Sequence, residues 1–276
     1  MADIRNTPSQ GHSQTVNKIT ERLSLFLGGS YSADTLTRDN SKKPLHERLY
    51  ARIAAVESRR QRNIEAIAQA AYESADEVAS DPDKGQANED WLARFIDLAQ
   101  DVASAEMQQV WGHVLACEIA APGSASVQML DALTAMVAAD LDLLEKVGRI
   151  RFPTGYLLKI SGRNEFEEFG ISEQQIAHLQ SLGLVQDAND LSVTFYAPTK
   201  GITFDFKGAD LIARHPTSQL FVLPAFRLTG IGNEIMPLVA DLPVDMDYLK
   251  ALGQDFKSRG YDYRIRDATG ALIEFV

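Results

Sequence analysis

The spacing of apolar residues predicts a run of helices in the first half of the chain. From Leu45 to about Ser80, apolar residues recur every three or four positions, which predicts one long amphipathic helix. Further stripes with helical spacing begin near Trp91, Met107, Met129 and Asp140. Pro and Gly break the pattern at residues 80–85 and again at Pro122-Gly123. We therefore expect residues 45–150 to form an all-α domain of antiparallel helices.

The pattern changes after Phe152-Pro153, where strand-like alternation joins helical spacing. Strands are expected at 156–160, 191–197, 202–206, 220–228, 261–266 and 272–275. Helices are expected at 171–182, 231–238 and 246–259. The helix at 171–182, followed by a hairpin of 191–197 and 202–206, resembles a winged-helix module. We expect residues 151–276 to form a small α+β domain with winged-helix-like character, so that the whole chain is mostly α.

Residues 1–44 are expected to form a flexible tail with one short amphipathic helix and a linker. Val16, Ile19, Leu23 and Phe26 recur at helical spacing, and Gly28-Gly29 then ends the helix. This helix could dock on the body, on a partner or on a membrane. Its polar face carries only Lys18 and Arg22 against Glu21, which favours docking on the body.

Composition narrows the class of protein without identifying a chemistry. The 276 residues are 45% hydrophobic and 24% charged, as in an ordinary globular protein. A single cysteine, Cys117, excludes an intrachain disulfide and fits a reducing compartment. The N-terminus has no secretory pattern, and no run of about 18 apolar residues occurs. We therefore expect a cytoplasmic protein with no transmembrane segment.

The net charge of −11 disfavours a surface that binds nucleic acid all round, but the charge is unevenly distributed. Residues 38–62 hold eight basic and three acidic groups, whereas residues 63–110 hold two basic and eleven acidic groups. Neighbouring helices that neutralise one another are the simplest interpretation. On the first long helix, one narrow arc carries a basic stripe, which could contact phosphates or an acidic partner: Arg48, Arg52, Arg59 and Arg62.

Two charged residues are expected on apolar helix faces, where each needs a partner. Arg60 falls within the apolar arc of the long helix, and Glu118 follows Trp111 by seven positions on another apolar face. We assign Arg60, Glu118 and Trp111 as buried structural residues. Arg60 could pair with Glu118, or Glu118 could accept backbone N–H groups from the turn at Gly123-Ser124. An enzyme hypothesis makes Glu118 a buried general base.

Searches for cofactor, metal and nucleophile motifs find nothing in the sequence. It has no phosphate-binding loop, nucleophile elbow, His-Glu-x-x-His or paired Cys-x-x-Cys motif. His113 and Cys117 share a helical face, but no second ligand pair accompanies them, so no metal or cofactor is expected. The winged-helix-like segment has no Lys or Arg between Arg163 and Lys200, which argues against DNA binding there.

The block Trp111-x6-Glu118-x3-Pro122-Gly123-Ser124 resembles a bacterial family known only as a domain of unknown function. It is more loosely similar to abortive-infection alpha-type proteins, which are linked to phage. Further matching segments are Arg60 to Glu65, Trp91 to Phe95 and Leu228 to Ile235. The resemblance implies a bacterial protein and a regulatory or phage-defence context, and it supplies no catalytic residue.

Together these patterns favour a non-enzymatic interaction or regulatory protein of unknown process with a protein partner, and they are compatible with a homo-oligomer. A first alternative is nucleic-acid binding through the stripe formed by Arg48, Arg52, Arg59 and Arg62. A second alternative is a hydrolase with Glu118 as its general base.

Overall fold

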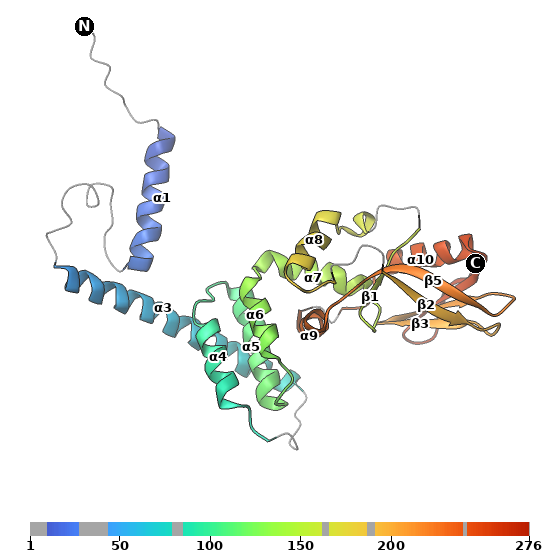
Figure 1. Cartoon of the computed structure of the whole chain (residues 1–276), viewed down its shortest axis with the longest axis horizontal. Coiled ribbons are helices and arrows are strands. Elements are labelled where there is room, and N and C mark those ends of the chain that lie inside the picture. Colours follow the sequence, from blue (N-terminus) through green and yellow to red (C-terminus); the bar gives the residue numbers. More distant parts are fainter. Residues whose placement is uncertain are drawn as a thin grey trace, which may run out of the picture.

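The protein is described by a computed structural model that covers residues 10–27, 44–78, 85–161, 166–186, 191–239 and 242–275. Figure 1 shows a helical body on one side and the strands, with the helix Met246–Ser258 beside them, on the other. The helix Gln10–Leu27 and the start of the helix Leu45–Ser74 project from the helical body. The helices of the first half are α1 (Gln10–Leu27), α3 (Leu45–Ser74), α4 (Glu89–Ala99), α5 (Ala105–Ala120), α6 (Val127–Ala135) and α7 (Ala138–Ile150). A short 3-10 helix, η2 (Ala75–Glu77), extends α3.

Polar caps begin the middle helices where the sequence places Asn or Ser before an apolar stripe. Asn88 accepts from two backbone N–H groups at the start of α4, and Ser104 and Ser126 cap α5 and α6. Phe95 and Trp111 are fully buried at the centre of the helical core. Gly112 lets α5 approach α3 closely, because a Cβ there would overlap Ala70.

The second half is built on two antiparallel sheets. One sheet has the strand order β1-β5-β2, and the other has the order β3-β4-β6-β7. The strands are β1 (Tyr156–Leu158), β2 (Ser192–Ala197), β3 (Ile202–Phe206), β4 (Ala209–Arg214), β5 (Gln219–Arg227), β6 (Asp262–Asp267) and β7 (Leu272–Phe275). The helices are η4 (Glu167–Phe169), α8 (Glu173–Ser181), α9 (Gly230–Val239) and α10 (Met246–Ser258).

The predicted fold class is wrong, because the described residues of the C-terminal half form two antiparallel sheets and no winged-helix arrangement. The segments expected to form a hairpin are both strands, but β2 pairs with β5 and β3 pairs with β4. A two-residue turn at Lys207-Gly208, with Gly208 at φ 86°, joins β3 to β4. The sequence prediction missed β4, and so it paired β3 with the wrong neighbour.

Helix α9 joins the two halves. It follows β5 directly along the chain and packs against α5, α6 and α7. At the same junction, Arg151 forms a bridge to Leu157 at the end of α7. One continuous set of buried residues therefore runs from the helices into the sheets.

Candidate functional site

The turn at residues 121–126 is held by groups from α5, which precedes it in the chain, and from α4. The side chain of Glu118, on α5, is buried, and its Oε1 accepts from Gly123 N at 2.8 Å. Its Oε2 accepts from Ala125 N at 3.0 Å and from Ser124 Oγ at 3.4 Å. Trp91, on α4, donates from Nε1 to Ala125 O at 2.8 Å. The buried Ala125 thereby has both its backbone N–H and its carbonyl oxygen hydrogen-bonded.

A second carboxylate reaches this turn from the other half of the chain. Glu234, on α9, accepts from Ser126 Oγ at 2.7 Å and from Ser126 N at 3.3 Å through one oxygen, Oε2. Ser126 Oγ in turn accepts from Met129 N at 3.1 Å and caps α6. We call residues 121–126, together with Glu118, Trp91 and Glu234, the clamped turn.

The clamped turn gathers three of the four segments on which the family resemblance rests. Glu118 and Gly123 come from one matching block, Trp91 from another and Glu234 from a third. Both carboxylate oxygens of Glu118 accept hydrogen bonds, in the arrangement expected of a cap on this turn. These hydrogen bonds connect α4 and α5 to the turn that precedes α6.

The third matching segment also positions α9. Thr229 donates to Gly183 O at 2.6 Å and accepts from Gly232 N at 3.0 Å, which ties the start of α9 to the loop after α8. A Cβ at Gly232 would overlap the carbonyl oxygen of Leu184. Glycine at this position therefore allows α9 to pack where its Glu234 reaches the clamped turn.

Arg60 corrects two sequence-based expectations. Its side chain is 33% exposed, so it is not buried, and it does not pair with Glu118. Its Nη2 and Nε instead bind Asp101 at 3.0 and 3.2 Å, and its Nη1 binds Glu57 at 3.3 Å. Arg60 lies where the apolar face of α3 leaves the helical body, so a carboxylate just after α4 can reach it. The hydrogen bond from Arg60 lowers the pKa of Asp101.

The predicted arginine stripe is only partly open to solvent. Arg52 and Arg62 are exposed, and Arg48 is half-buried. The Arg59 guanidinium binds Asp101 at 2.9 Å and stacks 4.4 Å from the ring centre of Phe26 on α1. The sequence did not single out Asp101, although the excess of acidic groups after residue 62 provided a general signal for such pairing.

Trp111 is fully buried and packs edge-on against Phe95, with ring centres 5.3 Å apart. Its Nε1 has no hydrogen-bond partner among the described residues. It lines a cavity of about 330 Å³ between the α4–α5 and α6–α7 connections, where most other lining side chains are apolar.

His113 and Cys117 are both half-buried on α5. Burial raises the pKa of the Cys117 thiol, which disfavours the thiolate. Within the described ranges, no group of three His, Cys, Asp or Glu side chains could hold a metal ion.

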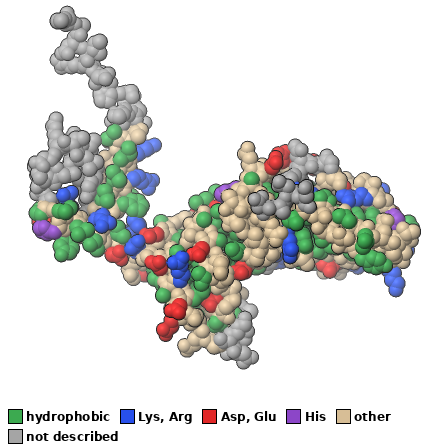
Figure 2. All heavy atoms as spheres, in the orientation of Figure 1, with side chains coloured by type: hydrophobic (Ala, Val, Ile, Leu, Met, Phe, Trp, Pro, Cys, Tyr) green, Lys and Arg blue, Asp and Glu red, His purple; other side chains and the backbone are tan. Residues whose placement is uncertain are grey.

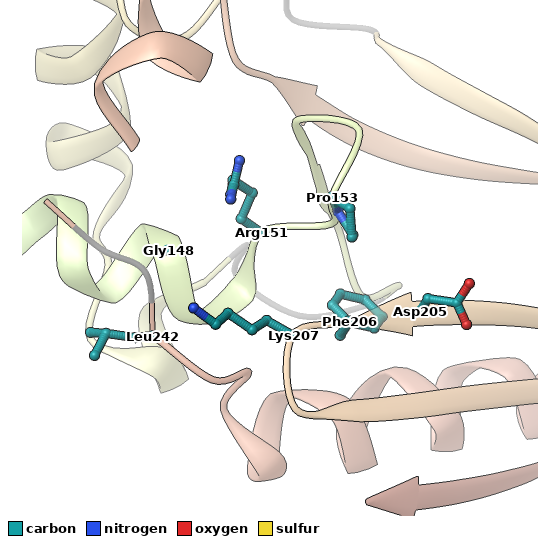
Figure 3. Close-up of a pocket in the computed structure, with 7 residues that line it drawn as sticks. All are labelled: Gly148, Arg151, Pro153, Asp205, Phe206, Lys207 and Leu242. Atoms are coloured by element: carbon teal, nitrogen blue, oxygen red, sulfur yellow. The ribbon is translucent and has the colours of Figure 1, made fainter. Parts of the chain in front are cut away.

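A cavity of about 290 Å³ with a mixed charged and apolar lining lies where α7 ends near the β3–β4 turn. Figure 3 shows its lining residues, with Arg151 and Lys207 from different segments and Asp205 directed away from both. Arg151 and Lys207 each have other interactions within the chain. The lining includes one carboxylate and no hydroxyl, thiol or imidazole. The sequence did not indicate this cavity.

The most unusual surface is apolar and lies on the part that projects from the helical body. We call α1 together with residues 45–58 of α3 the arm. Figure 2 shows hydrophobic side chains over both helices of the arm. Seven large ones are between 43% and 72% exposed: Ile19, Leu25, Phe26, Leu45, Leu49, Tyr50 and Ile53.

None of the described helices, including the two in the arm, is long and apolar enough to cross a membrane. Comparison with known proteins gives one family match: the model for a protein of unknown function, DUF2806, matches residues 47–253. No curated protein matches the chain. No solved structure matches it either. Because the match spans most of the chain, the protein belongs to the DUF2806 family of proteins of unknown function.

Proposed function

We propose that this protein is a cytoplasmic interaction or regulatory protein that binds another protein through its arm and carries out no catalysis itself. The observation that carries this proposal is the exposed apolar surface of the arm. Large exposed apolar patches are typical of sites that bind a partner.

The apolar stripe of α3 supports this proposal because it continues past the helical body. In the body, Ile67 is buried and Ile64 is half-buried, in the part of α3 that packs against α5. Ile53 and Leu49 lie on the same face of α3, eleven and fifteen positions before Ile64. They are 45% and 43% exposed. The spacing that serves packing against a helix in the body is thus kept beyond the body, where α1 contacts α3 but leaves Leu49 and Ile53 partly exposed.

The clamped turn supports the absence of catalysis. Glu118 is the residue of the hydrolase hypothesis, and both of its oxygens accept hydrogen bonds from the turn. A general base needs an oxygen within reach of a substrate proton. The hydrogen bonds that Glu118 accepts in the described residues come from two backbone N–H groups and from Ser124 Oγ, which is itself part of the turn.

The cellular context is a further part of the proposal. The resemblance to abortive-infection alpha-type proteins supports a role in the response to phage. We expect bacteria lacking the protein to differ from wild-type bacteria in the plating efficiency of at least one phage. We expect a variant with a disrupted arm to behave like the deletion. Equal plating with and without the protein, across a panel of phages, would contradict this context.

The docking function can be tested by affinity capture of the full-length protein from extract of its native cell. The test variant carries Leu49→Asp and Ile53→Asp in the arm. The matched control carries Tyr72→Asp and Ile119→Asp, which alter two residues that are 80% and 54% exposed outside the arm. We expect a discrete protein that the wild type and the control retain at high salt and the arm variant loses.

Two other results would redirect the proposal. Nucleic acid that is retained at low salt, released at high salt and lost in an Arg52→Glu, Arg62→Glu variant would favour the arginine stripe as the functional surface. A protein captured equally by the wild type and the arm variant would remove the arm from the proposed function.

A further inference from the structure

We infer that the partner of the arm is a second copy of this chain, so that two arms pack against each other across a two-fold axis. The inference rests on the proposed function and specifies its partner. A two-fold contact uses the same surface on both copies, so it needs a self-complementary apolar patch and no further binding site.

Both helices of the arm contribute to this patch. On α1, the half-buried Val16 and Leu23 lie on one side, while Ile19 and Phe26 remain about half exposed. On α3, the exposed Leu45, Leu49 and Ile53 continue the stripe that packs against α5 further along. A pair of helices cannot enclose an apolar core between them, whereas the four helices of two arms can.

The size of the patch suits a dimer. A large apolar side chain carries on the order of 100 Å² of surface, so the five exposed residues of the two stripes leave roughly 260 Å² in each arm. Leu25 and Tyr50, which lie beside these stripes, raise this to roughly 400 Å². Two arms would then bury about 800 Å² of apolar surface. With the usual polar share of an interface, the total reaches about 1,300 Å², which lies within the range of stable protein–protein interfaces.

Charge favours a second copy over an anionic membrane. The described residues of the arm hold four basic groups, Lys18, Arg22, Arg48 and Arg52, against Glu21, Glu47 and Glu57. Helices that lie on membranes usually carry many more cations. The chain as a whole has a net charge of −11, which an anionic bilayer would repel. Because the arm projects and is nearly neutral, two arms can meet while the acidic bodies stay apart (Figure 2).

The test is the mass of the full-length chain in solution, measured by light scattering and sedimentation velocity over a range of concentrations. We expect a dimer in the wild type, retained in the Tyr72→Asp, Ile119→Asp control. We expect the Leu49→Asp, Ile53→Asp variant to dissociate with a dissociation constant raised roughly 100-fold or more. Circular dichroism and thermal unfolding would show that all three chains are folded. High salt should not dissociate the dimer, because the contact is apolar.

Three results would overturn the inference. They are a wild type that stays monomeric at every concentration, a dimer that persists unchanged in the arm variant, and a monomer whose arm binds vesicles of phosphatidylcholine and phosphatidylserine. A monomer that still captures a cellular protein through its arm would refute the second copy and leave the proposed function standing. A monomer whose captures do not depend on the arm would refute both.

Discussion

Individual charged residues in this protein are held by backbone groups and by ion pairs from distant segments. Glu118 is an example of the first kind, because its oxygens accept from the turn that follows its own helix. Asp101 is an example of the second, because it binds both Arg59 and Arg60 from a helix about 40 positions earlier. The two residues differ in burial, and so they lead to different expectations for stability.

Replacing Glu118 should destabilise the fold in proportion to the hydrogen bonds lost. Glu118→Ala leaves the N–H groups of Gly123 and Ala125 without their acceptors, and we expect the free energy of unfolding to fall by about 2–4 kcal/mol. Glu118→Gln keeps one acceptor oxygen, so we expect the free energy of unfolding to fall by about half as much as in Glu118→Ala. Urea denaturation measures both values. If Glu118→Gln unfolded like the wild type, the cap assignment would be wrong.

The ion pairs of Asp101 predict that its contribution to folding stability depends on pH. Its pKa is lowered in the folded state, chiefly by the hydrogen bond from Arg60, so its contribution is present above the unfolded pKa of about 3.9. The contribution disappears as the pH falls through the lower, folded pKa. We expect Asp101→Asn to cost under about 1 kcal/mol at pH 7, because the side chain is half exposed, and nothing near pH 2. Denaturant titrations at both pH values test this, and an equal difference at the two would contradict it.

At the scale of elements, the local spacing of apolar residues predicted the helices and most strands. It did not predict which strands pair, because pairing depends on contacts between segments that are distant in the sequence. The Asn and Ser caps mark where helices α4 to α6 begin, and Pro122-Gly123 follows the end of α5. Strand β4 was missed because alanines fill two of its three core-facing positions, Ala209 and Ala213, which weakens the alternation. Without β4, residues 202–206 had no visible partner other than β2.

The candidate site was predictable to a similar extent. The burial of Glu118 and its cap on the turn follow from its spacing to Trp111 and from the Pro-Gly pair nearby. The partner of Arg60 does not follow, because the register between α3 and the end of α4 depends on how whole helices pack. Glu234 was visible only as part of a resemblance, and its contact with Ser126 spans 108 residues.

Helix α9 provides a test of packing at this scale. Gly232→Ala would place a Cβ against the backbone carbonyl of Leu184, and we expect a loss of about 1–3 kcal/mol in the free energy of unfolding. Gly230→Ala is the matched control in the same helix, because an added Cβ there has open space. Thermal unfolding of the two variants should therefore differ, and equal melting temperatures would show that the helix can shift to accept the methyl group.

At the scale of the whole molecule, the helical half and the sheet half share one core, joined by α9 and the clamped turn. The arm is the exception, because it extends from this core and exposes large apolar side chains (Figure 1). The division at residue 150 remains a prediction from the sequence. What the structure adds is the set of contacts that couple the regions on either side of it.

This coupling can be measured with the two native tryptophans, Trp91 and Trp111, which both lie in the helical half. In the wild type, tryptophan fluorescence and far-ultraviolet circular dichroism should report one coincident unfolding transition. Glu234→Ala removes the acceptor of Ser126 and should lower stability by about 1–3 kcal/mol and separate the two transitions. Glu145→Ala, at an exposed position of α7, is the control. Coincident transitions in the Glu234→Ala chain would show that apolar packing and the remaining polar contacts, such as His178 with Asp140 and Asp245 N with Arg149 O, couple the halves without Glu234.

The position of Glu234 in the chain also determines when its contact with Ser126 can form during translation. The ribosome makes Ser126 first and adds Glu234 only 108 residues later, which at typical elongation rates takes about 5–20 s. During that interval Ser126 lacks its hydrogen bond to Glu234. The surface of α5, α6 and α7 that later packs against α9 is also uncovered. We expect stalled nascent chains to resist protease in the helical half only once the stalling point lies far enough beyond α9 for that helix to leave the exit tunnel. Slow translation of the sheet half would therefore prolong the exposure of this face to chaperones.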